Sequence, residues 1–234
     1  MKKLPALNLP ATIKEDIEKH GQIRTFSKGE LLFTPEEMLE RFFVVFKGRI
    51  KVSQVDLKSS KEQTLKLLTT GDMYDVVSLL DHALHENILT ALDDATQIMV
   101  FPIQTVRSWI HGNNGFRQLL FPYVAKQIRD TEELALDLSF YNTSQRLLKL
   151  MVKNIDPAAP NKLKLIHDLP HEEIASLIGT VRKVLNRHIQ ELKEKDVIDV
   201  NERILPLKTH KTFWIISKIC SFATLVADKL FQMH

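Results

Sequence analysis

The chain has 234 residues, 44% of them hydrophobic and 26% charged, which is ordinary for one large or two small globular domains. Its net charge of +3 excludes a polybasic chain that binds nucleic acid along its whole length, although a local basic patch stays compatible with such binding. A lone cysteine, Cys220, excludes an intrachain disulfide and a four-thiolate iron–sulfur cluster.

Targeting and membrane signals are missing from the sequence. The start, MKKLPALNLP, lacks the long apolar core of a signal peptide. No uninterrupted apolar run reaches the roughly 20 residues that a membrane-spanning helix needs. We therefore expect a cytoplasmic protein without a membrane partner.

The N-terminal half is predicted to be mostly β-structure. After a short amphipathic helix at 11–19, short β-rich runs fill the stretch from Gln22 to Phe101. These runs are QIRTF, ELLF, RFFVVF, RIKVSQV, QTLKLL and TQIMVF, and glycine turns separate several of them. Many short strands with close turn signals predict an antiparallel β-roll of jelly-roll type, with a short helix at Val76–Leu80.

A short helix at 103–111 is followed by a long predicted helix from about Phe116 to Phe140. A heptad reading puts these residues on one seam: Leu120, Val124, Gln127, Thr131, Leu134, Leu138 and Tyr141. The mostly apolar seam predicts a coiled-coil dimer, and the alternative is a helix packed on its own domain. The polar Gln127 and Thr131 are either effector contacts or a device that fixes the register.

The segment from Pro170 to Lys195 predicts two helices joined by a tight turn. An apolar stripe at helical spacing precedes Gly179, which permits a left-handed backbone turn. The second helix is expected to begin near Thr180 or Val181. Small residues where the helices approach and an apolar anchor in the second helix are typical of a helix-turn-helix.

Polar side chains share one side of this second helix: Arg182, Lys183, Asn186, Arg187 and Gln190. Arginine forks match guanine edges, Asn and Gln match adenine edges, and Lys neutralises phosphate. The alternative is an ordinary solvated basic face. Polar residues near helix starts and in the following hairpin are candidate phosphate contacts: Thr143, Ser144, His171, Thr180 and Arg203.

The remaining elements complete a second domain. Before the helix-turn-helix, a helix is predicted at 145–153, a loop at 156–160 and a strand at 162–166. After it, two strands at 197–200 and 203–207 are predicted to form the wing of a winged helix-turn-helix. The apolar tail at 211–230 is expected to be a docked helix or a partner contact. The prediction is thus an α+β chain with a β-roll at 1–112, a dimerisation helix at 113–141 and a DNA-binding domain at 142–234.

Four segments carry a family resemblance: residues 28–33, 44–52, 71–72 and 172–198. Together they resemble the cyclic-AMP receptor and fumarate–nitrate regulator (Crp/Fnr) superfamily over roughly residues 10–208. The resemblance implies a homodimeric transcription regulator that binds double-stranded DNA and contacts RNA polymerase. It also implies that the roll senses a small molecule and that the long helices transmit its state.

Departures from the family pattern argue against cyclic AMP as the effector. Cyclic-nucleotide binders of this family carry Gly-Glu-Leu followed by Arg-Ser or Arg-Thr, whereas here Tyr74-Asp75 begins the first stretch and Glu86-Asn87 replaces the second. A glutamate repels the cyclic phosphate that arginine would bind. We expect no cyclic-AMP binding, and micromolar binding in a calorimetric titration would overturn this. The candidate effector-pocket residues are Tyr74, Asp75, Glu86, Asn87, Gln127 and Thr131.

Other branches of the family leave weaker signals. No cysteine lies near the N-terminus, which excludes the iron–sulfur sensor, and no metal site is predicted. His82 or His85 could be an axial haem ligand, although a surface loop histidine is the alternative reading. The roll is thus either a pocket for another small molecule, a cavity filled by side chains, or the site of a haem or redox signal.

In the recognition helix the family pattern of arginine, glutamate and arginine becomes Arg182, Lys183 and Arg187. We hypothesise that guanine contacts remain while the operator half-site differs. His188 is expected to be a partly buried structural residue.

A ligand-sensing module whose winged helix binds protein is the alternative function. No phosphate loop, HExxH or GxSxG motif suggests an enzyme.

Overall fold

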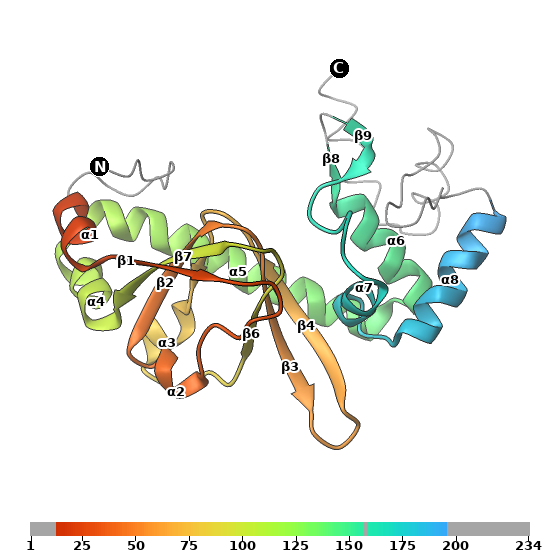
Figure 1. Cartoon of the computed structure of the whole chain (residues 1–234), viewed down its shortest axis with the longest axis horizontal. Coiled ribbons are helices and arrows are strands. Elements are labelled where there is room, and N and C mark those ends of the chain that lie inside the picture. The colour runs from red at the N-terminus through yellow and green to blue at the C-terminus, as the bar shows by residue number, and fades with distance from the viewer. Residues whose placement is uncertain (1–12, 157–158, 196–234) are drawn as a thin grey trace. The chain divides into compact units, whose positions relative to one another are not determined.

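The computed structural model describes residues 13–156 and 159–195 (Figure 1). The chain divides into two compact units, one of residues 1–60 with 64–133 and the other of residues 61–63 with 134–234. The predicted wing strands, the tail at 211–230, Arg203 and Cys220 lie outside the described residues. The predicted three-part division of the chain stays a prediction.

The first unit begins with helix α1 (Lys14–His20) and contains two antiparallel sheets. One sheet has the order β1-β7-β2-β5 and the other β4-β3-β6. The strands are β1 (Gln22–Phe26), β2 (Arg41–Lys47), β3 (Ile50–Asp56), β4 (Lys61–Leu68), β5 (Met73–Tyr74), β6 (Ile88–Ala91) and β7 (Thr96–Pro102). The predicted strand at 30–33 is wrong, since Leu31 makes only a single bridge to Thr90.

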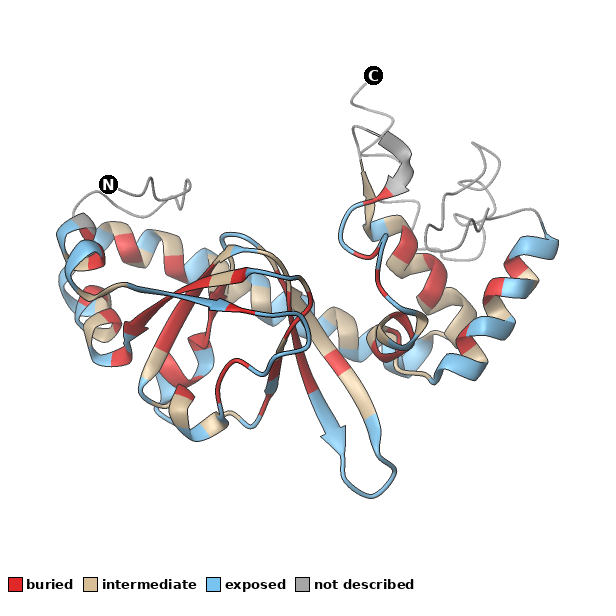
Figure 2. Cartoon of the chain, in the orientation of Figure 1, coloured by how far each residue is buried: buried red, intermediate tan, exposed pale blue. Residues whose placement is uncertain are grey.

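Strand β2 is buried on both faces, and this organises the core. Successive side chains of a strand point to opposite faces. Phe43 and Val45 therefore join one hydrophobic cluster, which includes residues of both sheets, while Phe42 and Val44 join a second cluster with helical residues. Burying each such side chain contributes about 1.5–3 kcal/mol to the stability of the fold. Figure 2 shows the buried residues of the two sheets in red.

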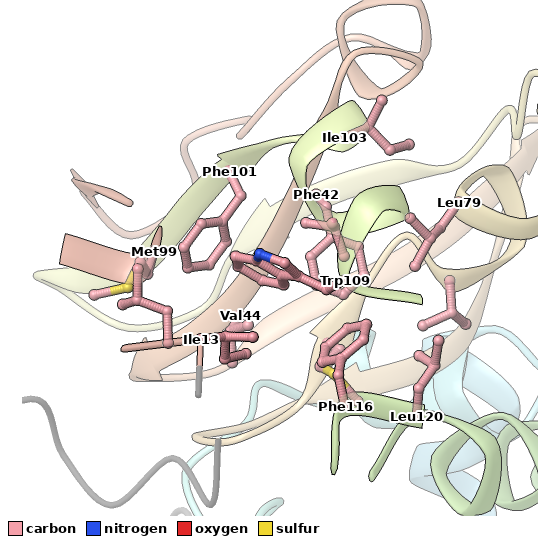
Figure 3. Close-up of a cluster of buried hydrophobic side chains, with 14 residues drawn as sticks. Ile13, Phe42, Val44, Leu79, Met99, Phe101, Ile103, Trp109, Phe116 and Leu120 are labelled. Carbon is pink, nitrogen blue, oxygen red and sulfur yellow. The ribbon is translucent and has the colours of Figure 1, made fainter. Parts of the chain in front are cut away.

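Four helices accompany these sheets: α2 (Pro35–Met38), α3 (Val76–Asp81), α4 (Ile103–Gly112) and α5 (Asn114–Phe140). Trp109 of α4 packs edge-on between Phe101 and Phe116, with ring centroids 5.3 and 5.5 Å away (Figure 3). The Tyr123 hydroxyl of α5 donates to the Met73 carbonyl oxygen at 2.9 Å and accepts from its N–H at 3.0 Å. These contacts fix the first half of α5 on the roll.

In the second unit, helix α6 (Thr143–Lys153) begins with a capping box between Asn142 and Gln145. Strands β8 (Ile155–Asp156) and β9 (Ala159–Leu163) follow and pair antiparallel, so Asp156 and the residues from Ala159 on lie in strands where a loop was predicted at 156–160. Helices α7 (His171–Leu177) and α8 (Arg182–Glu194) complete the described part. Buried side chains from all three helices form its core: Leu147, Leu148, Met151, Ile174, Ala175, Leu185, Ile189 and Leu192.

Candidate nucleic-acid interface and effector site

The turn between α7 and α8 has the geometry that its glycine permits. Gly179 has φ +67°, and the Thr180 N–H donates to the Ala175 carbonyl oxygen at 2.9 Å. A side chain at position 179 would place its Cβ only 2.6 Å from Leu138 Cδ2. Because of both constraints only glycine fits without strain. The second helix begins at Arg182, close to the predicted start.

Helix α8 has one buried side and one exposed side, as Figure 2 shows. Leu185, Ile189 and Leu192 are buried. The exposed residues include all five that the sequence proposed as DNA contacts: Arg182, Lys183, Asn186, Arg187 and Gln190. His188 lies at the border, half-buried, with Nδ1 3.1 Å from Glu191 Oε2. The basic and amide side chains are therefore available to a partner along one face.

Two polar bridges connect the start of α7 to this face. The Arg182 guanidinium donates from Nη1 to Glu172 Oε1 at 2.6 Å. His171 Nδ1 lies 2.7 Å from Asn186 Oδ1 and donates to it, because a carbonyl oxygen only accepts. The sequence pointed to His171 as a phosphate contact and to Glu172 only as an acidic residue suited to a helix start, so the bond from Arg182 to Glu172 was not predicted.

The other candidate phosphate contacts lie at helix starts. Thr143 and Ser144 are the first residues of α6 and are half-buried, and the Thr143 hydroxyl accepts a hydrogen bond from Arg146 at 3.4 Å. Thr180 is half-buried in the turn before α8. Each of these residues therefore lies where a helix start could contact a phosphate.

In the first unit, a polar network surrounds the buried Asp75. Its carboxylate caps α3 by accepting from the Val77 N–H at 2.9 Å, and it accepts from the Ser78 hydroxyl at 2.9 Å and from His85 Nδ1 at 2.8 Å. Burial alone would raise the pKa of Asp75, but these hydrogen bonds outweigh it and hold the pKa below its ordinary value of 3.8. The aspartate is therefore held as a bonded anion.

Asn87 closes the network on the other side. Its amide nitrogen donates to the Tyr74 hydroxyl at 3.0 Å and to His85 Nε2 at 2.8 Å. The imidazole of His85 therefore has a partner at each ring nitrogen, the Asp75 carboxylate at Nδ1 and the Asn87 amide at Nε2. Asn87 Oδ1 is buried and has no partner among the described residues. Hydrogen bonds thus link Tyr74, Asp75, His85 and Asn87 into one network, and the Asn87 carbonyl oxygen is the atom left without a partner in it.

Lys66 of β4 is the residue of this region that sequence reasoning missed. Its ammonium donates to Gln127 Oε1 of α5 at 2.7 Å and lies 5.5 Å from the centroid of the Tyr74 ring. Burial lowers the pKa of Lys66 below its ordinary value of 10.5, against the attraction of Asp75 and Asp72. Its strand alternation could have identified it, because Thr64 and Leu68 on the same face are buried.

Two of the predicted effector-pocket residues lie apart from these contacts. Glu86 is exposed, and its carbonyl oxygen accepts from Gln54 at 3.3 Å. Thr131 is exposed on α5, where its hydroxyl donates to the Gln127 carbonyl oxygen. The other four predicted pocket residues are brought together by contacts with His85 and Lys66. His85 contacts Asp75 and Asn87, and Lys66 contacts Gln127 and lies near the Tyr74 ring.

The histidines do not fit a haem site. Both ring nitrogens of His85 are engaged by Asp75 and Asn87, so iron could bind only after a buried hydrogen bond is broken. His82 is exposed at the C-cap of α3. Among the residues that the structure describes, no cluster of three or more His, Cys, Asp or Glu could hold a metal ion.

The predicted dimer seam on α5 needs a correction. Leu120 is fully buried in the core of its own unit, and Val124 packs against that core, so Leu120 cannot contact a partner helix. Leu134 and Tyr141 are half-buried. The exposed side keeps Thr131 and Leu138 of the predicted seam and adds Phe121, Ile128 and Ala135, each one residue after a predicted position. We call these five residues the outer stripe.

The correction has a simple cause. Successive residues of a helix lie about 100° apart, so adjacent heptad readings describe different faces. Leu120 and Phe121 are both apolar, and both begin a repeat of seven residues. Packing on the roll buries the first of the two and leaves Phe121 and Ile128 52% and 55% exposed.

Comparison with known proteins agrees with this architecture. Residues 23–113 match the family model "Cyclic nucleotide-binding domain" and residues 144–210 match "Crp-like helix-turn-helix domain". The chain is 23% identical to the global nitrogen regulator of Synechocystis, over 77% of this chain and 82% of that protein. It is 22% identical to the CRP-like cAMP-activated global transcriptional regulator of Mycobacterium tuberculosis, over 76% and 80%.

A solved structure shares the fold. The c-di-GMP-responsive global regulator CLP of Xanthomonas campestris superposes with a TM-score of 0.72 at 16% identity, covering 86% of this chain and all of that one. Across the described ranges, no helix is both long and apolar enough to cross a bilayer.

Proposed function

Because the chain belongs to the Crp/Fnr superfamily of transcription regulators, we propose that it is a homodimer that binds specific sequences of double-stranded DNA. The superfamily consists of transcription regulators and not enzymes, and its helix-turn-helix members bind DNA and typically act as dimers. One observation carries the specific-binding proposal. Arg182, Asn186 and Arg187 are exposed on α8, opposite its buried side.

Charge supports DNA as the partner of this face. Arg182, Lys183 and Arg187 bring cationic groups to the N-terminal half of α8. A basic face that carries base-reading residue types suits the major groove, whereas a protein-binding helix typically buries an apolar anchor. We propose that Thr143, Ser144, His171 and Thr180 help to position the domain through phosphate contacts.

The outer stripe supports dimerisation through α5. Phe121, Ile128 and Leu138 are exposed large apolar side chains on a helix of 27 residues. Water-exposed apolar side chains at heptad spacing are stabilised by a second helix that covers them. Two copies joined in this way would present two α8 helices to two half-sites of DNA.

Three observations support independence from cyclic AMP. The position expected for a phosphate-binding arginine carries Glu86, which is exposed. The Asp75 carboxylate places a second negative charge nearby, and it already has three hydrogen-bond partners. Lys66 already bonds Gln127, so the roll and α5 are joined without a ligand. RNA polymerase contact and a cytoplasmic location remain part of the proposal.

Selection from a random duplex pool tests the function. The full-length protein is incubated with random duplexes, and bound DNA is recovered and sequenced over several rounds. We expect two related half-sites about one helical turn apart, and sedimentation should give two chains per duplex. Recovery of unenriched sequences, or one chain per duplex, would contradict the proposal. Unenriched DNA would favour the alternative that the winged helix binds protein.

A further inference from the structure

We propose that Glu172 is a positioning residue for Arg182 and thereby contributes to base discrimination. The inference rests on the proposed function, because it assigns Glu172 a role in how the α8 face reads DNA. Glu172 is the second residue of α7 and Arg182 is the first residue of α8. The two side chains meet across the turn, with Arg182 Nη1 donating to Glu172 Oε1 at 2.6 Å.

The backbone under both residues is firmly held. Ile174 and Ala175 of α7 and Leu185 of α8 are buried, and the Thr180 N–H closes the turn on the Ala175 carbonyl oxygen. The distance between the first turns of the two helices is therefore fixed by packing. A carboxylate presented from α7 can then restrict the rotamers of a long side chain on α8.

The bond uses only one edge of the guanidinium. Arginine carries five N–H donors, and Glu172 is the one side chain bonded to Arg182 in the described ranges. Guanine recognition needs two donors, one to O6 and one to N7. Nε and Nη2 remain for that purpose while Nη1 is held. A fixed fork loses less side-chain entropy when it binds a base than a free one does.

The neighbouring residue makes a parallel bridge. His171 Nδ1 donates to Asn186 Oδ1 at 2.7 Å, and Asn186 lies one helical turn after Arg182. With its oxygen held by His171, the Asn186 carboxamide keeps its two amino N–H donors for another partner. The first two residues of α7 therefore each hold one polar residue of the exposed α8 face.

The exposure of the ion pair determines how large the effect can be. The side chains of Arg182 and Glu172 are 61% and 56% exposed. Pairs as exposed as this change an equilibrium by only about one- to fivefold, so the bond yields readily to DNA. A carboxylate near the phosphates also repels DNA. If repulsion were its only effect, removing the charge would tighten binding to every sequence alike.

This contrast defines the test. Duplexes recovered by the wild-type protein are changed at each base pair in turn, and competition binding gives the discrimination at each position for the wild-type, R182A, R187A, E172A and E172Q proteins. R182A should lose about 5- to 150-fold of discrimination at one base pair of each half-site. E172A should lose about two- to fivefold at that same base pair and not at the one lost in R187A.

Two comparisons separate positioning from charge removal. E172Q keeps an oxygen that accepts from Nη1, so it should retain more of the discrimination than E172A, although both remove the charge. E194A removes a carboxylate at the other end of α8, where Glu194 accepts from Gln190 at 3.2 Å, and should leave the Arg182 base pair unaffected. Thermal unfolding of each variant checks that the fold is retained.

The inference is overturned if E172A keeps wild-type discrimination at the Arg182 base pair. It is equally overturned if E172A and E172Q tighten binding to all duplexes to the same extent, or if discrimination falls evenly at every position. Each of these results leaves sequence-specific binding by the wild-type protein intact. If the wild-type protein selects no sequence at all, the proposed function fails and the inference fails with it.

Discussion

The Lys66 ammonium of β4 donates to Gln127 Oε1 of α5 across 2.7 Å, and this bond ties the roll to the long helix. The lysine is half-buried, and this burial lowers its pKa below 10.5. A buried cation tolerates the loss of its acceptor poorly, because it cannot regain the hydration that burial removed.

The two partners should therefore respond unequally to substitution. Q127L leaves the ammonium without its acceptor and should lower the free energy of unfolding by about 1–3 kcal/mol. K66M removes the charge together with its desolvation cost and should lower it less. Urea unfolding measures both. R129A, at an exposed site of the same helix outside the outer stripe, is the control, and an equal or reversed order of the two variants would contradict this account.

Asp75 should make the roll sensitive to acid. Because the pKa of its carboxyl is held below 3.8 in the folded protein, the charged form stabilises the fold above about pH 4, and this contribution is lost as pH falls through the folded pKa. D75A should lower the free energy of unfolding by about 2–4 kcal/mol at pH 7, through loss of the helix cap and of the hydrogen bonds from His85 and Ser78.

The pH dependence supplies the sharper check on Asp75. The difference between wild-type and D75A proteins in urea unfolding should shrink between pH 5 and the acid limit of the folded state. D81A removes an exposed carboxylate of the same helix, which accepts from the Ala83 N–H at 2.9 Å, and should change stability only slightly. A wild-type advantage over D75A that stays constant down to the acid limit would refute the assigned ionisation.

Ile128 should be important for dimerisation. It is 55% exposed on the outer stripe of α5, so a charge there would be buried in a helix–helix seam. I128D should raise the dissociation constant of the dimer by about 30-fold or more, measured by sedimentation equilibrium. L57D changes a side chain that is 91% exposed in a turn and should leave the constant unchanged. A dimer that survives I128D would place the seam elsewhere.

Cyclic AMP should have no effect on this protein. Calorimetric titration at millimolar nucleotide should give no saturable heat, because Glu86 and Asp75 oppose the cyclic phosphate and no arginine lies between Arg49 and Arg107. The Mycobacterium tuberculosis relative, which is described as cAMP-activated, serves as the positive control. Saturation at micromolar concentration would show that the nucleotide binds through other groups.

The helix-turn-helix could be predicted closely from sequence because its signals are local. Gly179 marks the turn, and the apolar positions of α7 and α8 follow helical spacing. The exposed face of α8 follows directly from that spacing. The bridge from Glu172 to Arg182 could not be predicted in the same way, since it depends on the crossing of two helices.

The features that could not be predicted from the sequence, the contact of Lys66 with Gln127 and the exposed side of α5, depend on packing between distant segments of the chain. Lys66 meets Gln127 only after a strand and a helix separated by many residues are brought together. The outer stripe of α5 differs from the predicted seam because the roll, and not the heptad pattern, determines which apolar side chain is buried. The alternation of β4 did contain a signal for Lys66, since Thr64 and Leu68 beside it are buried.

The central claim is that paired α8 helices read DNA through Arg182 and Arg187. The most direct measurement compares the wild-type protein and the R182A/R187A variant in equilibrium binding to the selected duplex and to a scrambled duplex of the same composition. The account predicts that the wild-type protein prefers the selected duplex by about 1,000-fold or more and that the variant loses most of this preference. A variant that keeps the full preference would contradict the account.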